Sequence, residues 1–460
     1  MFKRKQIDMV NGPLLKNMIM FAIPVMLASL IQIVFNALDL VFAGQFCGTE
    51  GLTAVSSTTA LTSLLTSLFL GLGVGVNVAM AHALGSKNEE AVSRVVHTAI
   101  PLALVGGFLL FAFGFFFSKP ILVAMDTDAD VLDTATNYMK IYFVGCIPML
   151  VYNFAAGIFR ADGDSETPMN FIILAGCINL CLKPFFIRVL GWDVMGIATS
   201  TAITHLISAT LSIRLLMKKK DACRFEWNKM RFHKRELGRL LVLGIPAGLQ
   251  SSMFAISNVL IQSAVNGIGN ELGKAFIAGN GAANNVENAL NAVVHSVYQA
   301  SINFTGQNAG NGNIKRVKQV FKTSIAMVAV LGVSLCTLVF LFKNPIMSIY
   351  TSDPLSIEYG VKYRIMFVCV PYFLWAIQDT MAGSIRGMGS SVPPTVISIL
   401  GVCVFRVTWQ YTVYPAVGTV ESLFIAYPIS WLLTGIANLI CYLVVFRKFK
   451  KRLLARGLNE

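Results

Sequence analysis

The stretch RADGDSETP at residues 160–168 returns in altered form as RGMGSSVPP at residues 386–394, 226 positions later. The dipeptide Ile23-Pro24 recurs in the same way at Ile245-Pro246. These matches indicate that the chain consists of two duplicated halves. We expect an amino-terminal half at 1–217, a basic linker at 218–236 and a carboxy-terminal half with a basic tail at 237–460.

The composition indicates that both halves lie in a membrane. Of the 460 residues, 55% are hydrophobic and only 13% are charged, which exceeds what the core of a soluble domain requires. A spanning helix needs about 20 apolar residues, and the chain has twelve such runs. They lie at 14–44, 52–84, 95–118, 132–160, 166–189, 195–217, 237–266, 273–308, 320–343, 358–385, 391–413 and 420–446.

The fold class predicted is an all-α integral membrane protein with twelve transmembrane helices in two pseudo-symmetric six-helix lobes, since the alternating pattern of a membrane barrel is absent. Basic connections alternate with neutral or acidic ones, so we expect both termini in the cytoplasm of a multi-pass protein of the cell membrane. The net charge of +14 is confined to these connections and does not indicate nucleic acid. Each half holds an even number of helices, an arrangement typical of transporters with a central cavity. We expect a monomer in the lipid bilayer.

Three segments carry a family resemblance: NALDLVFAGQF in the first helix, YNFAAGIFRADGDSETP ending the fourth, and IRGMGSSVPP ending the tenth. Their order resembles the multidrug and toxic compound extrusion (MATE) family over nearly the whole chain, and most closely its DNA-damage-inducible, proton-coupled branch. The resemblance implies a cation-coupled antiporter that exports lipophilic, often cationic drugs or metabolites in exchange for protons or sodium ions.

The first helix places Gln32, Asn36 and Asp39 on one face, at i, i+4 and i+7. A carboxylate inside a membrane costs about 2.5 to 3.5 kcal/mol on insertion scales, so it normally faces a cavity or a partner. We expect all three side chains to contact substrate and Asp39 to be a proton-coupling site as well, and a permanent structural ion pair of Asp39 is the alternative. Pro24 is either the hinge of this helix or a static kink.

The fifth helix departs from the family pattern Asn-x-x-x-Asp, since Asn179 matches but Lys183 stands where the acid is expected. Lys183 is predicted to pair with Asp39, and the alternative is that it extends to the membrane surface near Arg188. A sodium site in this lobe becomes unfavourable. The resemblance further implies that Tyr152 and Asn153 of the fourth helix line the lobe and, with Asn179, contact substrate.

The second half has acids of its own. Asp379 corresponds by the repeat to Asn153, and Arg406 in the eleventh helix is its expected partner. We expect Asp379 either to be a further proton-coupling site or to form a structural ion pair. Glu287 shares a face of the eighth helix with Asn284, which predicts either a site for a proton or substrate or a cluster of hydrogen bonds between helices. His295, two turns further on, is a candidate relay.

Other classes of function fit less well. The sequence has no HExxH, GxSxG or GxxxxGK[ST] motif, and its nine cysteines lack the paired spacing of a zinc site. We therefore expect neither an enzyme nor a cofactor or metal. A channel would be expected to show filter sequences rather than a duplication. The main rival is a flippase for lipid-linked saccharides, in which Lys183 and Arg406 would contact pyrophosphate, but the motifs favour export.

Overall fold

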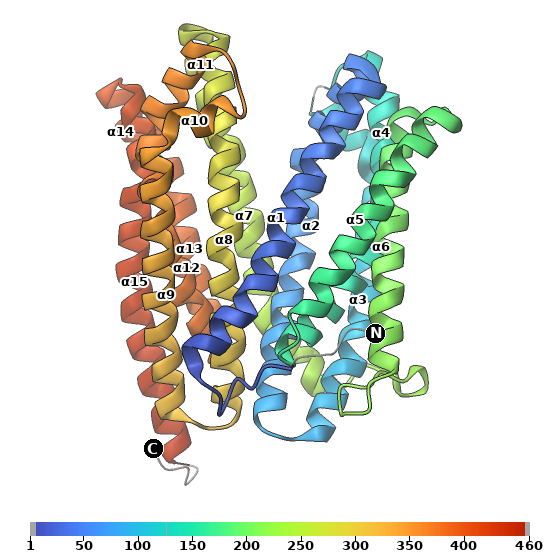
Figure 1. Ribbon diagram of the computed structural model, residues 1–460, viewed down its shortest axis with the longest axis vertical. Helices are drawn as coiled ribbons and strands as arrows, with labels where there is room; N and C mark the ends of the chain where they lie inside the picture. The colour runs from blue at the N-terminus through green and yellow to red at the C-terminus, as the bar shows by residue number, and fades with distance from the viewer. Residues whose placement is uncertain (1–5, 126, 456–460) are drawn as a thin grey trace. The chain divides into compact units, whose positions relative to one another are not determined.

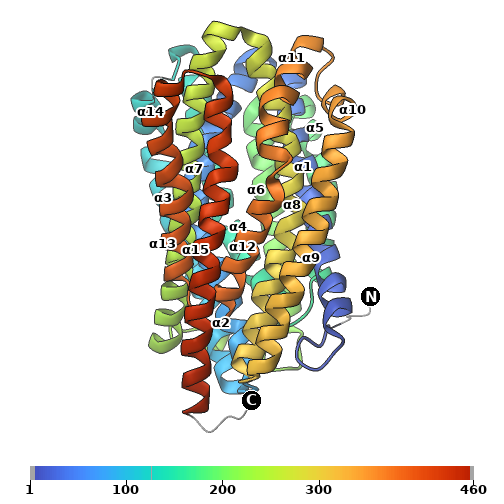
Figure 2. The same ribbon diagram turned by 90° about the vertical axis from the view of Figure 1, so that its left-hand side faces the viewer.

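A computed structural model describes residues 6–125 and 127–455, and the regular elements in this part of the chain are helices (Figure 1). They form two compact units. Unit 1 comprises residues 6–8 and Leu27–Ser252, and unit 2 comprises Met9–Met26 and residues 253–455. Within each unit the long helices run roughly along one direction, as Figure 2 shows for α9 and α15 of unit 2.

The helices of unit 1 are α2 (Gly48–Gly85), α3 (Glu89–Ala124), α4 (Ala129–Ala161), α5 (Glu166–Pro184) with the π-helical segment η1 (Phe185–Val189), and α6 (Asp193–Met217). The short η2 (Trp227–Lys229) lies in the linker. The helices of unit 2 are α8 (Lys274–Gly310), α9 (Ile314–Leu341), α10 (Lys343–Ser348), α11 (Pro354–Tyr359), α12 (Tyr372–Gly387), α13 (Val392–Ser398), α14 (Phe405–Val417) and α15 (Val420–Leu454), with π-helical segments η3 (Gly360–Cys369) and η4 (Ile399–Val404). Helices α1 (Leu14–Phe46) and α7 (Lys234–Leu272) contribute to both units.

The duplication is visible in equivalent helix starts. Asn88 caps α3 by accepting a hydrogen bond from the backbone N–H of Ala91 at 2.9 Å. Asn313, 225 residues later, caps α9 by accepting one from Arg316 at 2.8 Å. An asparagine at this position satisfies a backbone donor that the first helical turn leaves unpaired. The repeated sequence therefore sets the same local structure in both halves.

Eleven helical spans in the described residues are long and apolar enough to cross a membrane. The twelfth predicted span is α8, which is 37 residues long but carries many asparagines and Glu287. The prediction of twelve spanning helices is thus matched by the elements, and the polarity of α8 marks a site. The sequence did not indicate that the tenth and eleventh spans are interrupted by η3 and η4.

The packing units and the sequence halves differ at α1 and α7. Residues Met9–Met26 pack in unit 2, where Asn308 Nδ2 donates to the Met9 carbonyl at 3.0 Å. The first part of α7 packs in unit 1 against α2, where a Cβ added to Gly71 would lie 2.1 Å from Gly248 Cα. Only glycine permits so close an approach of two backbones.

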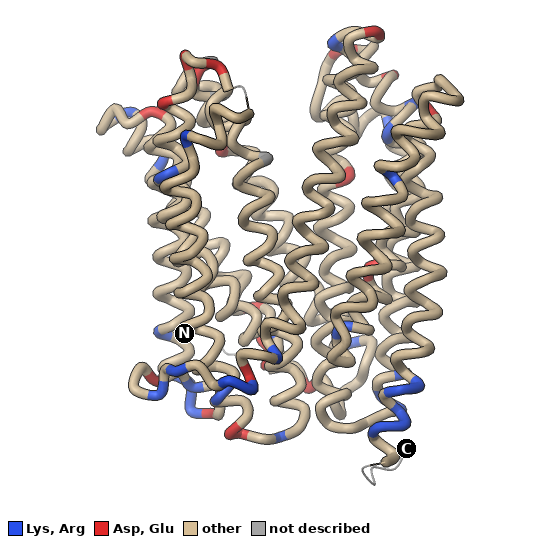
Figure 3. Tube along the Cα trace, turned by 180° about the vertical axis from the view of Figure 1, so that it is seen from behind, with Lys and Arg blue, Asp and Glu red and all other residues tan. Residues whose placement is uncertain are grey.

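The basic residues gather at particular places in each unit (Figure 3). In unit 1 they gather around the linker at 218–236, and in unit 2 along the last turns of α15. Charges confined to helix ends and connections keep the spanning segments apolar, as bilayer insertion requires. The few charged side chains that remain inside the spans are therefore the residues that need explanation.

Candidate functional site

Unit 1 holds an ion pair between α1 and α5. Lys183 Nζ donates a hydrogen bond to the carboxylate of Asp39. The lysine side chain is only 1% exposed and that of Asp39 is 25% exposed. The predicted pairing is therefore confirmed, and extension of Lys183 to the membrane surface is wrong. We call these two residues the unit 1 pair.

The other residues predicted for this lobe lie in different surroundings. Asn179, one turn before Lys183, is buried and accepts a hydrogen bond from Ser200 at 3.4 Å. Gln32 and Asn36 are exposed on α1. The Tyr152 hydroxyl donates to the Pro168 carbonyl at 3.0 Å, and Asn153 Nδ2 donates to the Met149 carbonyl at 2.8 Å. Contact of these side chains with substrate stays a prediction.

Unit 2 holds a second ion pair, between α8 and η3. Arg364 donates from Nε and Nη2 to one carboxylate oxygen of Glu287, at 3.1 and 2.8 Å. The same guanidinium donates to Asn280 at 3.0 Å and to Asn284 at 2.7 Å. Its side chain is 9% exposed and that of Glu287 is 17% exposed. We call Glu287 and Arg364 the unit 2 pair.

Helical spacing in the sequence indicated Glu287 and Asn284 but not Arg364. A signal was available, because an arginine within an apolar span is costly and must find an acid or amide. The position lies in VKYRIMFVC, close to the expected start of the span, where a base can extend to the membrane surface.

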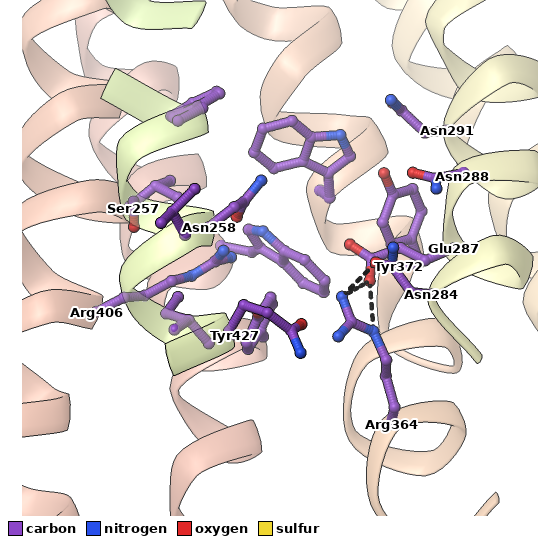
Figure 4. Close-up of a pocket in the computed structure, with 17 residues that line it drawn as sticks. Ser257, Asn258, Asn284, Glu287, Asn288, Asn291, Arg364, Tyr372, Arg406 and Tyr427 are labelled. Carbon is purple, nitrogen blue, oxygen red and sulfur yellow. Dashed lines mark hydrogen bonds and ion pairs between the residues drawn. The ribbon is translucent and has the colours of Figure 1, made fainter. Parts of the chain in front are cut away.

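The unit 2 pair lies at one side of a pocket of about 410 Å³ (Figure 4). Its polar lining includes Asn258, Asn288 and Asn291, while Tyr372, Trp375, Tyr427 and Trp431 supply aromatic walls. Arg406 lies at the opposite side from Glu287 in Figure 4. A cavity that combines aromatic walls with converging polar groups can bind a small molecule.

The predicted pair between Arg406 and Asp379 is wrong. Asp379 lies 3.9 Å from His295 Nδ1, whereas Arg406 Nε donates to Ser430 at 2.9 Å. The π-helical segment η4 ends two residues before Arg406, and a π turn shifts the phase of the residues that follow it. His295, the candidate relay for Glu287, contacts Asp379 and, at 3.1 Å, Gln299.

Three of the buried bases lie in or beside a π-helical segment, whereas Lys219 and Arg386 do not. Lys183 comes two residues before η1, Arg364 lies inside η3, and Arg406 follows η4 by two residues. Such segments widen one turn of a helix and occur frequently at functional sites. In this chain they aim long basic side chains into the interior of a unit.

One group of metal-ligand types lies outside the spans. Ligand atoms of Asp162, Asp221 and Cys223 lie within 4.8 Å of one another. Lys219 Nζ forms an ion pair with Asp162 and lies 3.4 Å from Asp221, so an ammonium already balances these carboxylates. Burial raises the pKa of the Cys223 thiol, which disfavours the thiolate that binds metals. The group ties the linker to the end of α4.

The sequence of this chain is similar to those of known proteins over most of its length. The MatE family model matches residues 24–185 and 246–412. The "Probable multidrug resistance protein YoeA" of Bacillus subtilis is 27% identical over 395 residues, which cover 84% of each chain. An "FAD transporter" of Shewanella oneidensis is 26% identical over 451 residues, covering 95% of this chain and 96% of the other.

A solved structure has the same fold. It is described as the outward-facing conformation of a multidrug resistance MATE family transporter, and its TM-score to this chain is 0.89 at 19% identity. The match covers 98% of this chain and 100% of the other. The prediction of a twelve-helix, two-lobed membrane fold is thereby confirmed.

Proposed function

Because the chain belongs to the MatE family, whose model matches both of its halves, we propose that it is an antiporter that exports lipophilic drugs or metabolites in exchange for protons. Members of this family are membrane transporters of small molecules, and a multidrug resistance protein is among the relatives. The observation that carries proton coupling is the unit 1 pair. It places a carboxylate and a lysine together inside the spanning helices.

The unit 1 pair has the chemistry of a proton switch. A buried carboxylate must be either paired or protonated, and a lysine, unlike an arginine, releases its own proton readily when buried. Protonation of Asp39 removes the charge that holds Lys183, and loss of that proton restores the pair. The two states therefore differ in which groups occupy the interior of unit 1. We propose that substrate release accompanies protonation of Asp39.

Pro24 is the candidate bending point of helix α1. It lies two residues before the point where α1 passes from unit 2 to unit 1. A proline inside a helix removes one backbone hydrogen bond and lowers the resistance to bending. We propose that Pro24 is the hinge at which residues 27–46 respond to the protonation of Asp39.

The two acids of unit 2 have separate roles in this proposal. Glu287 is held by a guanidinium that cannot lose its proton, so we assign it a structural role in shaping the pocket. Asp379 lies 3.9 Å from His295 Nδ1, and we propose this pair as an accessory proton site. A sodium-coupled mechanism is disfavoured, because the ammonium of Lys183 already occupies the carboxylate that a cation would need.

Transport into proteoliposomes tests the proposal. Two pyrene amphiphiles that differ only in their charged group, pyrenebutyrate and pyrenebutyl-trimethylammonium, are offered under an imposed pH gradient or an imposed sodium gradient. We expect the pH gradient to drive uptake of at least one of them by the wild type but not by Asp39→Asn. The control is Asp133→Asn, since that carboxylate is 82% exposed on α4. Uptake driven only by sodium, or undiminished in Asp39→Asn, would contradict proton coupling at this residue.

A further inference from the structure

Arg406 is a buried base without an acidic partner. It is 6% exposed and lines the pocket of unit 2. Its Nε donates to the Ser430 hydroxyl at 2.9 Å, and within the described part of the chain Nη2 is buried without a hydrogen-bond partner. None of the ion pairs among the described residues includes Arg406. A buried guanidinium normally requires a carboxylate, phosphate or comparable acceptor.

Aromatic rings hold this guanidinium but do not neutralise it. Its central carbon lies 3.9 Å from the Tyr427 ring centroid and 5.3 Å from that of Trp431. Such contacts orient a cation and offset part of its desolvation. They leave the full positive charge in place.

Two further donors in the lining of the pocket lack hydrogen-bond partners among the described residues. The indole nitrogens of Trp375 and Trp431, which both line it, are buried without hydrogen-bond partners in the described residues. An indole nitrogen can only donate. Because Glu287 is neutralised by Arg364, the three charged side chains of the lining sum to one positive charge. The ligand that satisfies this lining carries acceptor oxygens and a negative charge.

We propose that the unit 2 pocket binds the anionic group of an amphipathic aromatic substrate, with Arg406 as the residue that selects its charge. The proposal rests on the export function given above and names the class of substrate. Carboxylate, sulfonate or phosphate oxygens would accept hydrogen bonds from the guanidinium. Rings of the substrate would stack against Trp375, Tyr372 or Tyr427, and the volume of about 410 Å³ lies in the range of small-molecule pockets.

This inference differs from the expectation of cationic substrates. Attraction of a cation requires an acid that is free to pair with it. The acid of this pocket, Glu287, already accepts two hydrogen bonds from Arg364. A cationic substrate would place a second positive charge beside Arg406, which is unfavourable in an interior of low dielectric constant.

Equilibrium dialysis with the two pyrene amphiphiles tests the proposal. Wild-type protein in nanodiscs is compared with Arg406→Gln and Arg406→Lys, and empty nanodiscs correct for partition into lipid. We expect the wild type to bind pyrenebutyrate more tightly than the ammonium compound. Arg406→Gln should weaken pyrenebutyrate binding about 10- to 100-fold, as expected for loss of a charge-assisted hydrogen bond, and Arg406→Lys should restore part of it. Binding of the ammonium compound should stay the same or tighten.

Two results would overturn the proposal. One is tighter binding of the ammonium compound than of pyrenebutyrate by the wild type. The other is an equal loss of affinity for both compounds in Arg406→Gln, which would indicate that Arg406 has a purely structural role. If Arg406→Gln does not fold, Trp375→Phe replaces it, since this change removes one donor and keeps an aromatic ring. Trp375→Phe should weaken the binding of pyrenebutyrate and leave the binding of the ammonium compound unchanged. If the binding experiment gives either of these results while the wild type still shows pH-driven uptake, only the anion site is rejected. If the wild type shows no pH-driven uptake of either compound, the proposed export function is rejected.

Discussion

The ion pairs of the two units differ in how firmly their acids are held. In unit 1 a single ammonium contacts Asp39, which is 25% exposed. In unit 2 a guanidinium makes two hydrogen bonds to Glu287 and two more to asparagine side chains. A lysine can lose its proton when buried, and an arginine cannot. The difference indicates a pair that can open in unit 1 and a fixed pair in unit 2.

The two pairs are also not related by the internal repeat. Shifting Asp39 by the 222 residues that separate Pro24 from Pro246 leads to Ile261. Shifting Glu287 back by the 225 residues that separate Asn313 from Asn88 leads to Thr62. The duplicated halves thus keep equivalent helix starts while placing their charges at different positions. Coupling and substrate recognition can therefore reside in different halves of one fold.

The largest effect is expected from removing the acid of the fixed pair. Glu287→Gln leaves Arg364 as an uncompensated buried charge, which should lower the free energy of unfolding by about 3 kcal/mol. Thermal melting of the detergent-solubilised protein, followed by circular dichroism, measures the change. Glu358→Gln, at an exposed position of α11, is the matched control and should melt like the wild type.

The double variant Glu287→Gln, Arg364→Gln checks the cause. Removing both charges should recover much of the lost stability, because no uncompensated charge then remains. A single variant that melts at the wild-type temperature would show that the unit 2 pair is not a fixed structural element. The contrast with unit 1 would then fail.

The next effect concerns a helix crossing found in unit 1. Gly248→Ala should lower stability by about 2 kcal/mol, because the new methyl group would meet the backbone of Leu68, whose carbonyl oxygen lies 2.1 Å from that position. Gly267→Ala on the same helix meets nothing within 4 Å and should be neutral or slightly stabilising. Thermal melting of the two variants measures the difference, and equal melting temperatures would show that the crossing tolerates expansion. The repeat places Ser296 in unit 2 where unit 1 has Gly71, so this close approach belongs to one half.

Much of the fold could be predicted, because bilayer insertion imposes long apolar runs and basic connections. The Asp39 and Lys183 pair was also within reach, since an acid and a base buried in neighbouring spans of one half must compensate each other. Asn284 was placed correctly near Glu287 by helical spacing alone. These inferences depend on composition and on regular helical geometry.

Prediction of side-chain partners from the sequence failed where the helical geometry is irregular. The segments η3 and η4 have no recognisable pattern in GVKYRIMFVC or ILGVCV, yet they set the phase of Arg364 and Arg406. An extra residue in one turn rotates the following side chains by about 100°. Regular spacing therefore could not show that Arg364 meets Glu287, or that Arg406 turns towards Ser430 instead of Asp379.

Exchanging the base of the unit 1 pair tests whether that pair must open. Lys183→Arg supplies a base that keeps its proton, so the pair should lock and pH-driven uptake should fall about 10- to 100-fold. Arg188→Lys, five residues further on, is the control and should transport normally. The Arg188 guanidinium lies over the Phe46 ring, with its central carbon 4.5 Å from the ring centroid, and a lysine can keep this contact. Undiminished uptake in Lys183→Arg would mean that release of Lys183 is not part of the cycle.

The smallest effect is expected from the reciprocal exchange in unit 2. Arg364→Lys keeps the positive charge beside Glu287 but cannot reproduce the planar set of hydrogen bonds to Glu287, Asn280 and Asn284. Loss of a net hydrogen bond should lower stability by about 1 kcal/mol, measured by the same melting experiment, while pH-driven uptake should persist. If Arg364→Lys instead abolished uptake or changed its pH dependence, the unit 2 pair would also belong to the coupling mechanism. The two units would then differ in geometry but share one role.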